Sequence, residues 1–170
     1  PSGFSRFTPF MLSLPVLLLS APSAQAVAPT SVISAKAADG AQIAQDIASA
    51  GRLRTQSQRL AKLYLQAAMG LQAGQARQQI DSGMADVDAE FNRLSRYGRK
   101  ANMQRAYTRS ETPWQEMRGL LKKSPDTATR ERMNLVADEL MVHTGKLAML
   151  IEGEGETAVG RMLDLLSWLN

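Results

Sequence analysis

The chain has 170 residues, a net charge of +4, one His and no Cys. The absence of Cys excludes disulfide frameworks, thiolate metal sites and Cys nucleophiles, and a single His argues against a His-based zinc site. Aromatic residues make up only 5% of the chain, and its many Ala, Leu, Gln and Met residues favour helices over a β-sandwich. We therefore expect an all-α domain with no cofactor and no metal.

The sequence also lacks the motifs of the common enzyme and nucleic-acid-binding classes. It contains no nucleophile–base pair, phosphate-binding loop or dinucleotide-binding glycine motif, so we expect no enzymatic activity. Its Arg and Lys residues are scattered among acids and glutamines, whereas nucleic-acid binding favours clustered basic residues. The mild positive charge suits a small anion better than a nucleic acid.

Residues 1–26 have the pattern of a secretory signal peptide. Arg6 provides a positive charge, residues 10–19 form a short apolar core, and Ala24–Ala26 has the small residues of a cleavage site. No stretch of about 18 apolar residues follows Ala26, so we expect no membrane span in the mature chain. The prediction is an exported, periplasmic protein.

Apolar residues recur at three- and four-residue spacing throughout residues 40–152, and no segment shows the period of two that is typical of strands. Turn residues separate the periodic segments, with a candidate N-cap for the last one at Asp126 or Thr127. The pattern predicts an antiparallel up-down four-helix bundle, with helices over 40–74, 75–97, 101–123 and 128–152.

Breaks and ends are expected at particular positions. Residues 27–39 are rich in Ala, Ser, Pro and Thr and predict a flexible lead-in. Gly74 is predicted to end the first helix, and Pro113 to start or kink the third. Residues 153–170 predict a terminal helix. The glycines of 152–156 can break the helix between it and the bundle, although two Gly cost only about 2 kcal/mol in a long helix.

The segment 50–64 differs from ordinary bundle sequence because polar residues fall on its apolar seam. Arg54 and Ser57 share that seam with Ala50, and a buried guanidinium costs several kcal/mol unless an anion meets it. Gly51, three residues before Arg54, leaves room beside it. Two interpretations remain open at this point, namely a ligand site and a solvated basic face.

The same segment, Gly51–Tyr64 (GRLRTQSQRLAKLY), resembles the signature of the PilJ-type domain. That domain is the extracytoplasmic N-terminal module of type IV pili methyl-accepting chemotaxis transducers. The segment is also similar to the conserved box of nitrate and nitrite sensor kinases. The matching pairs are Ala50-Gly51, Leu53-Arg54, Gln56-Ser57 and Arg59-Leu60.

The resemblance implies a four-helix sensor bundle that dimerises through its first helix and holds an anion across the dimer interface. Arg54 matches the arginine that binds the anion, and Gly51 matches the glycine beside it. Arg52 and Arg59 match other basic positions with supporting electrostatic roles, and Ser57 completes the expected anion-binding set. Guanidinium offers parallel N–H donors that fit two oxygens of a planar oxyanion such as nitrate.

These inferences lead to one functional hypothesis and one alternative. The hypothesis is an exported sensor domain for a nitrate- or nitrite-like anion, a homodimer through residues 43–71 that signals through a partner protein or a further receptor portion. Close approach of the two first helices is expected along the small residues Ala50, Ala61 and Ala68. The alternative is a non-catalytic helical interaction module with no small-molecule ligand.

Residues 157–165 (TAVGRMLDL) have two equally weighted interpretations. They resemble the lead-in to a second copy of the box, as found in tandem members of the family. They also have the pattern of an ordinary amphipathic terminal helix.

The predicted signal peptide can be tested directly. Because the small-residue site ends at Ala26, we expect N-terminal sequencing of the exported protein to begin at Val27. Recovery of a membrane-bound form that retains Arg6 would contradict the prediction.

Overall fold

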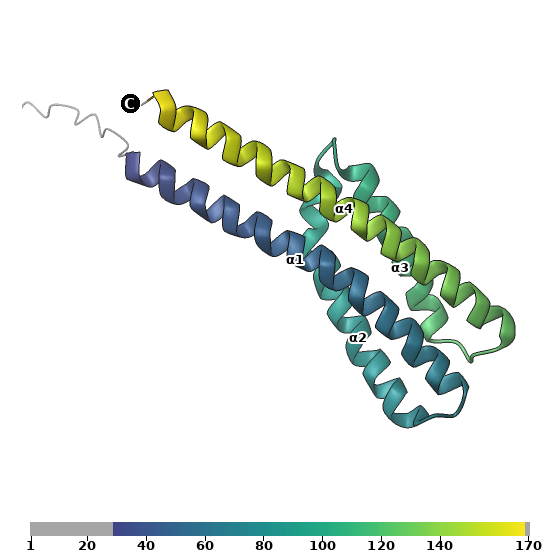
Figure 1. The fold of residues 1–170 in the computed structure, drawn as a ribbon. Coiled ribbons are helices and arrows are strands. Elements are labelled where there is room, and N and C mark those ends of the chain that lie inside the picture. The colour runs from purple at the N-terminus through teal and green to yellow at the C-terminus, as the bar shows by residue number, and fades with distance from the viewer. Residues whose placement is uncertain (1–28, 169–170) are drawn as a thin grey trace, which may run out of the picture.

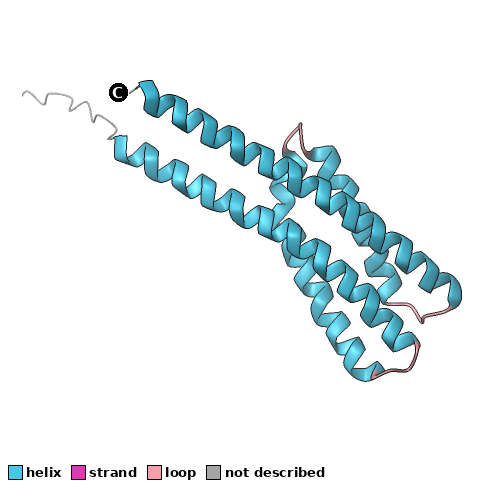
Figure 2. Cartoon of the chain, in the orientation of Figure 1, coloured by secondary structure: helices cyan, strands magenta, loops and turns pink. Residues whose placement is uncertain are grey.

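The structure, a computed structural model, describes residues 29–168 and is helical almost throughout. Its long helices are α1 (Pro29–Ala68), α2 (Ala73–Leu94), α3 (Gln104–Leu121) and α4 (Thr127–Trp168), with a short 3-10 helix, η1 (Ser95–Arg99), after α2. No strand occurs in this range (Figure 2). The all-α prediction is confirmed, and the predicted signal peptide, residues 1–26, lies outside the described residues.

The helices alternate in direction and form the predicted up-down bundle. Figure 1 shows α1 and α4 side by side, with α2 packed on α1 and α3 packed on α4. At one end α1 and α4 run on together beyond η1 as a two-helix extension. These helices have 40 and 42 residues, yet no helix of the described range has a stretch long and apolar enough to cross a membrane.

The first helix begins earlier and ends earlier than the sequence predicted. Residues 29–39, predicted as a flexible lead-in, are helical, because Pro is well tolerated in a first helical turn and the Ala residues that follow favour helix. Gly70 rather than Gly74 ends the helix. Gly70 has a φ of +73°, and the bonds from Gly70 N to Ala67 O and from Leu71 N to Gln66 O close a Schellman motif around it.

The third helix continues through its proline. Pro113 is buried inside α3 and neither starts that helix nor interrupts it.

The fourth helix continues through its glycines. It is capped by Asp126, whose Oδ1 accepts a hydrogen bond of 2.7 Å from Thr129 N. It does not break at residues 152–156. Gly155 instead lets α1 approach α4, since a Cβ there would lie 3.0 Å from Ile43 Cγ2.

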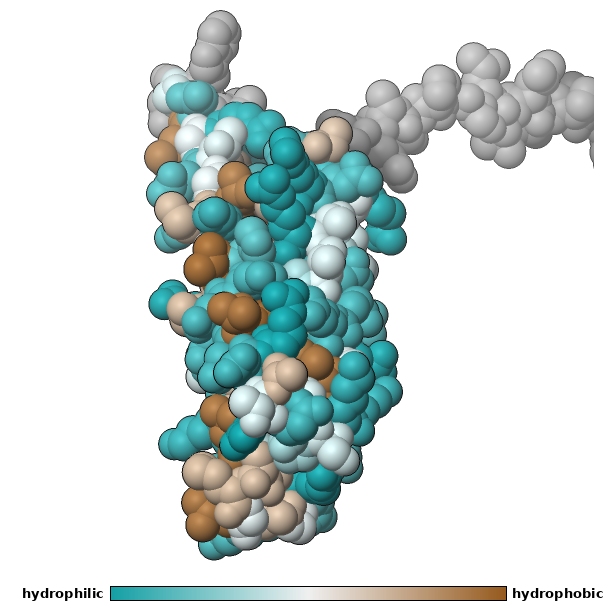
Figure 3. Space-filling view, turned by 90° about the vertical axis from the view of Figure 1, so that its right-hand side faces the viewer, coloured by the Kyte–Doolittle hydropathy of each residue, from teal (hydrophilic) through white to brown (hydrophobic). Residues whose placement is uncertain are grey.

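The core lies between the four helices and is rich in Leu, Met and aromatic residues. Phe91 stacks on Trp114 and packs edge-on against Tyr107. Gly98 allows Tyr107 to approach η1, because a Cβ at this position would lie only 2.8 Å from its ring. The face drawn in Figure 3 is mainly hydrophilic, with apolar residues in separate spots. The largest fully buried side chains are Trp114, Tyr97, Leu53, Leu60, Leu94, Met103, Met117, Met133, Leu140, Leu147, Ile151 and Val87.

Candidate functional site

Arg54 lies just outside the buried face of α1. It follows the fully buried Leu53, and one residue rotates a side chain by about 100° around a helix. Its side chain is exposed, so the expectation that it is buried on the apolar seam is wrong for a single chain. Water solvates the guanidinium, and no buried charge has to be compensated there.

Ser57 and Gly51 lie on different faces of the helix, about 120° apart around its axis. Ser57 is fully buried, and its hydroxyl donates a 2.9 Å hydrogen bond to the carbonyl oxygen of Arg54. Gly51 is exposed, and a Cβ built on it would meet no atom within 4 Å. Ser57 is therefore a satisfied core residue in this chain, while Gly51 leaves open space on the outer surface.

Arg52 and Arg59 lie on the flank of α1 that faces α2. Arg52 forms a two-point ion pair with Glu90, with Nε–Oε1 at 2.6 Å and Nη2–Oε2 at 3.1 Å. Partial burial acts to raise the pKa of Glu90, but hydrogen bonds from Arg52 and Ser49 outweigh it and lower the pKa. Arg59 donates a 3.3 Å hydrogen bond to Gln79. Both arginines thus have partners within the chain.

The five predicted site residues do not converge on one point of a single chain. Arg54 is separated by about 160° from Arg52 and by about 140° from Arg59 around the helix axis. The small-residue seam is also occupied, because Ala50 and Ala61 are buried in their own core at 1% and 6% exposure. The α1 helix of a second copy therefore cannot pack along that seam. Any dimer contact of α1 must use its outer face.

A buried charge network lies two turns before Arg54. Asp46 has no exposed surface, and its Oδ2 accepts hydrogen bonds from Arg96 Nη2 and, at 2.7 Å, from the Tyr97 hydroxyl. Gln42 Nε2 donates to Oδ1 at 3.1 Å. Burial raises the pKa of Tyr97 to about 12, so the phenol stays protonated and remains a donor to the carboxylate.

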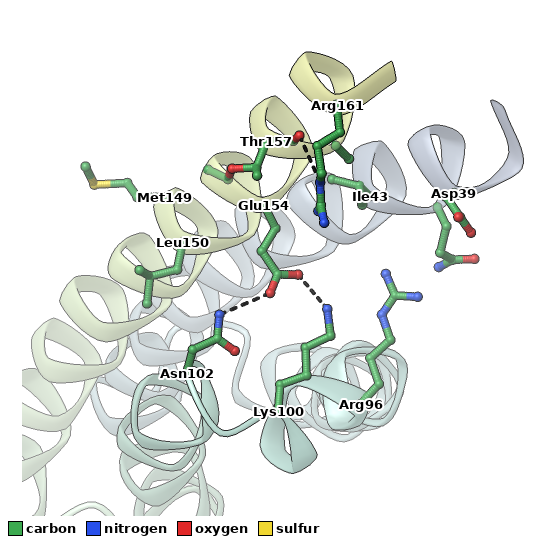
Figure 4. Close-up of a pocket in the computed structure, with 13 residues that line it drawn as sticks. Asp39, Ile43, Arg96, Lys100, Asn102, Met149, Leu150, Glu154, Thr157 and Arg161 are labelled. Carbon is green, nitrogen blue, oxygen red and sulfur yellow. Dashed lines mark hydrogen bonds and ion pairs between the residues drawn. The ribbon is translucent and has the colours of Figure 1, made fainter. Parts of the chain in front are cut away.

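A groove of about 680 Å³ opens beside this network, where α1 and α4 leave the bundle (Figure 4). Glu154 of α4 bridges to the α2–α3 connection, accepting hydrogen bonds from Lys100 Nζ at 2.5 Å and from Asn102 Nδ2 at 3.4 Å. Partial burial acts to raise the pKa of Glu154, but these two donors outweigh it and lower the pKa. Arg96 and Lys100 are therefore already paired, and this groove is mainly a junction between elements.

The sequence showed only part of this junction. Asp46 is visible as an acid on the buried stripe of the first helix, four residues before Ala50. Its partner Arg96 is 50 residues away, and nothing in local periodicity links the two positions. Glu154 falls in a segment that was expected to break the helix, so its contact with Lys100 could not be inferred. Among the described residues, no three His, Asp or Glu side chains gather as a metal site.

The fold and its charged junction define an all-α module in which two long helices leave a four-helix bundle together. The chain belongs to the family described as the type IV pili methyl-accepting chemotaxis transducer N-terminal (PilJ) domain, since the family model matches residues 38–138, more than half of the chain.

The match confirms the resemblance seen in residues 51–64, which lie within the matched range. Domains of this family are sensor-type signalling modules of chemotaxis transducers and are typically periplasmic. No curated protein and no solved structure matches this chain.

The Asp46 network makes a prediction about stability. Asp46→Ala removes the carboxylate to which Tyr97 and Arg96 donate, and we expect the free energy of unfolding to fall by about 2–3 kcal/mol. This loss is smaller than that for breaking a fully buried ion pair, because water reaches Arg96. Asp46→Asn should lose less, because one carbonyl oxygen remains. Urea unfolding measures both losses. The control is the exposed Asp81→Ala, expected within about 0.5 kcal/mol of the unmodified protein; equal losses for both alanine variants would contradict the structural role of Asp46.

Proposed function

We propose that this chain is an exported sensor domain that recognises a small oxyanion, nitrate- or nitrite-like, between two copies of α1. The ligand class and the dimer come from the resemblance of residues 51–64 to the nitrate and nitrite sensors. Signal output then passes to a partner protein or to a further portion of a receptor. The periplasm is the proposed location, in keeping with the family.

The state of Arg54 is the single observation that best supports this proposal. Of the three arginines in the box, Arg52 and Arg59 donate to Glu90 and Gln79, whereas the guanidinium group of Arg54 makes no hydrogen bond or ion pair in the described part of the chain. Gly51, one turn earlier, offers no side chain to block an approaching ligand. A free guanidinium beside open space can present two parallel donors to an oxyanion.

The outer face of α1 supports close approach of a second copy. Ala44, Ala48, Gly51 and Thr55 recur there at spacings of four, three and four, and all are exposed. This surface replaces the buried seam as the proposed dimer contact within residues 43–71. Two Arg54 side chains near a twofold axis would repel each other unless an anion lies between them, which couples ligand binding to the placement of the two helices.

The two-helix extension suggests a route for the signal. Lys100 and Asn102 donate hydrogen bonds to Glu154 of α4. Arg96 and Tyr97 donate hydrogen bonds to Asp46 of α1. The segment between α2 and α3 therefore contacts both long helices where they leave the bundle. A shift of α1 within the bundle would be transmitted to the two-helix extension through these contacts. Rigid helices of this kind transmit small displacements because packed interfaces do not deform continuously.

A specific observation favours the alternative, a helical interaction module without a ligand. Leu135, Val142 and Met149 recur every seven residues on α4, with exposed fractions of 57%, 48% and 71%. Apolar side chains at this spacing form the type of stripe that pairs with another helix. That alternative predicts assembly that does not respond to anions.

The anion site is tested with Arg54 variants. We expect Arg54→Ala to abolish the stabilisation by sodium nitrate while changing the stability of the unliganded protein by less than about 0.5 kcal/mol, because the side chain is exposed. Arg54→Lys should also largely fail, since an ammonium lacks the paired planar donors. Titration calorimetry and thermal melts at two ionic strengths measure these effects.

Arg59→Ala is the matched control for this series. It removes the same charge from the opposite flank of α1 and should weaken binding only modestly through the local potential. Equal losses for Arg54→Ala and Arg59→Ala, both removed by salt, would show that Arg54 is an ordinary solvated surface charge.

The dimer is tested on the outer face of α1. Ala48→Glu places a carboxylate at the proposed contact, and we expect it to convert a dimer into a monomer in light scattering. Ala89→Glu, on the exposed side of α2, is the matched control and should remain dimeric. A monomeric unmodified protein at high concentration, with and without nitrate, would rule out the proposed assembly.

A further inference from the structure

A cluster of basic side chains that form no ion pair within the described residues lies between α3 and α4. Arg105 and Arg109 of α3 and His143 and Lys146 of α4 line a cleft of about 270 Å³, together with Asn102. Arg105 and Arg109 are four residues apart and His143 and Lys146 three, so each pair lies on one face of its helix. Two helices thus direct four nitrogen-bearing side chains to one small space.

None of these charges is neutralised within the described part of the chain. The cations in its ion pairs are all elsewhere, namely Arg52, Arg93, Arg96, Lys100, Arg118 and Arg132. No carboxylate lines the cleft. The acids nearest to it have other partners or lie outside it. Glu154 accepts a hydrogen bond from Asn102 at the edge of the cleft and is paired with Lys100. Glu111 accepts a hydrogen bond from Tyr107, and Glu139, one turn before His143, does not line the cleft.

We propose that this cleft binds a small tetrahedral oxyanion with two negative charges, of the phosphate or sulfate class. Two guanidinium groups supply forked donors and Lys146 supplies a point charge, which together favour a dianion over a monovalent anion. The volume lies just below the roughly 300–1,000 Å³ of pockets for drug-sized ligands. It suits an inorganic anion with part of its hydration shell.

This cleft adjoins the groove of Figure 4, with which it shares Asn102 and Leu150, and Arg54 does not line it. Arg96 and Lys100, which line that groove, are held by Asp46 and Glu154, whereas the cations of the α3–α4 cleft have no such partners. The proposal does not depend on nitrate binding by α1. The two sites differ in their helices and in the anion charge that each favours.

The experiment is titration calorimetry of the purified protein with sodium phosphate and, separately, sodium sulfate, with sodium nitrate and sodium chloride at matched ionic strength. We expect saturable binding of both dianions, and the ratio of their affinities distinguishes the two sources. The double variant Arg109→Gln, Lys146→Gln should weaken this binding about tenfold or more. Both side chains sit on helix surfaces, and a thermal melt without ligand checks that the fold is retained.

Matched controls make the outcome decisive. The double variant Lys62→Gln, Arg77→Gln removes the same charges from exposed positions on α1 and α2 and should bind the dianions as tightly as the unmodified protein. Arg54→Ala should also retain dianion binding, so failure here is distinguishable from failure of the nitrate proposal. Absence of saturable binding, or equal losses in both double variants, would overturn the proposal and identify the cleft as solvated cations. If the first double variant fails to fold, the single variant Arg109→Gln gives the same comparison against Arg77→Gln.

Discussion

The buried carboxylate of Asp46 controls how the parts of this molecule are placed. A fully desolvated charge is stable only where donors surround it, and here the donors come from η1 and from the preceding turn of α1. Tyr97 can meet Asp46 only if η1 lies against α1. That position brings Lys100 and Asn102 to Glu154 of α4. The junction of bundle and extension follows from these contacts.

The distribution of paired and unpaired cations separates structural arginines from candidates for ligand binding. Arg52 joins α1 to α2 through Glu90, and Arg132 joins α4 to α3 through Glu116 with an Nε–Oε1 distance of 2.5 Å. Exposed pairs of this kind contribute little stability individually, but they define which helices are neighbours. Arg54 and the cations of the α3–α4 cleft have no such partner in the described chain. Their charge therefore remains available to an anion.

A sensor requires that ligand binding alter something that a second protein can detect. In this fold the long helices α1 and α4 share the core of the bundle and then continue together past η1 (Figure 1). Their continuity through Gly51 and residues 152–156 costs about 1 kcal/mol for each interior glycine, and packing contacts such as Ile43 against Gly155 offset that cost. Membership of the chemotaxis transducer family is consistent with this layout.

The sequence by itself determined the all-α class, the order and approximate limits of four helices, and the family, because apolar periodicity and the motif of residues 51–64 are local properties of the chain. It also predicted the turn before α4, where Asp126 caps the helix. Tertiary structure decided where the buried face of α1 ends. Arg54 and Leu53 differ by one residue in sequence, yet one is exposed and the other fully buried, because the orientation of α1 depends on how α2 and α4 pack around it. The pairing of Asp46 with Arg96 and the placement of Arg109 and Lys146 along one cleft likewise bring together positions far apart in the chain, and local periodicity carries no information about such placements.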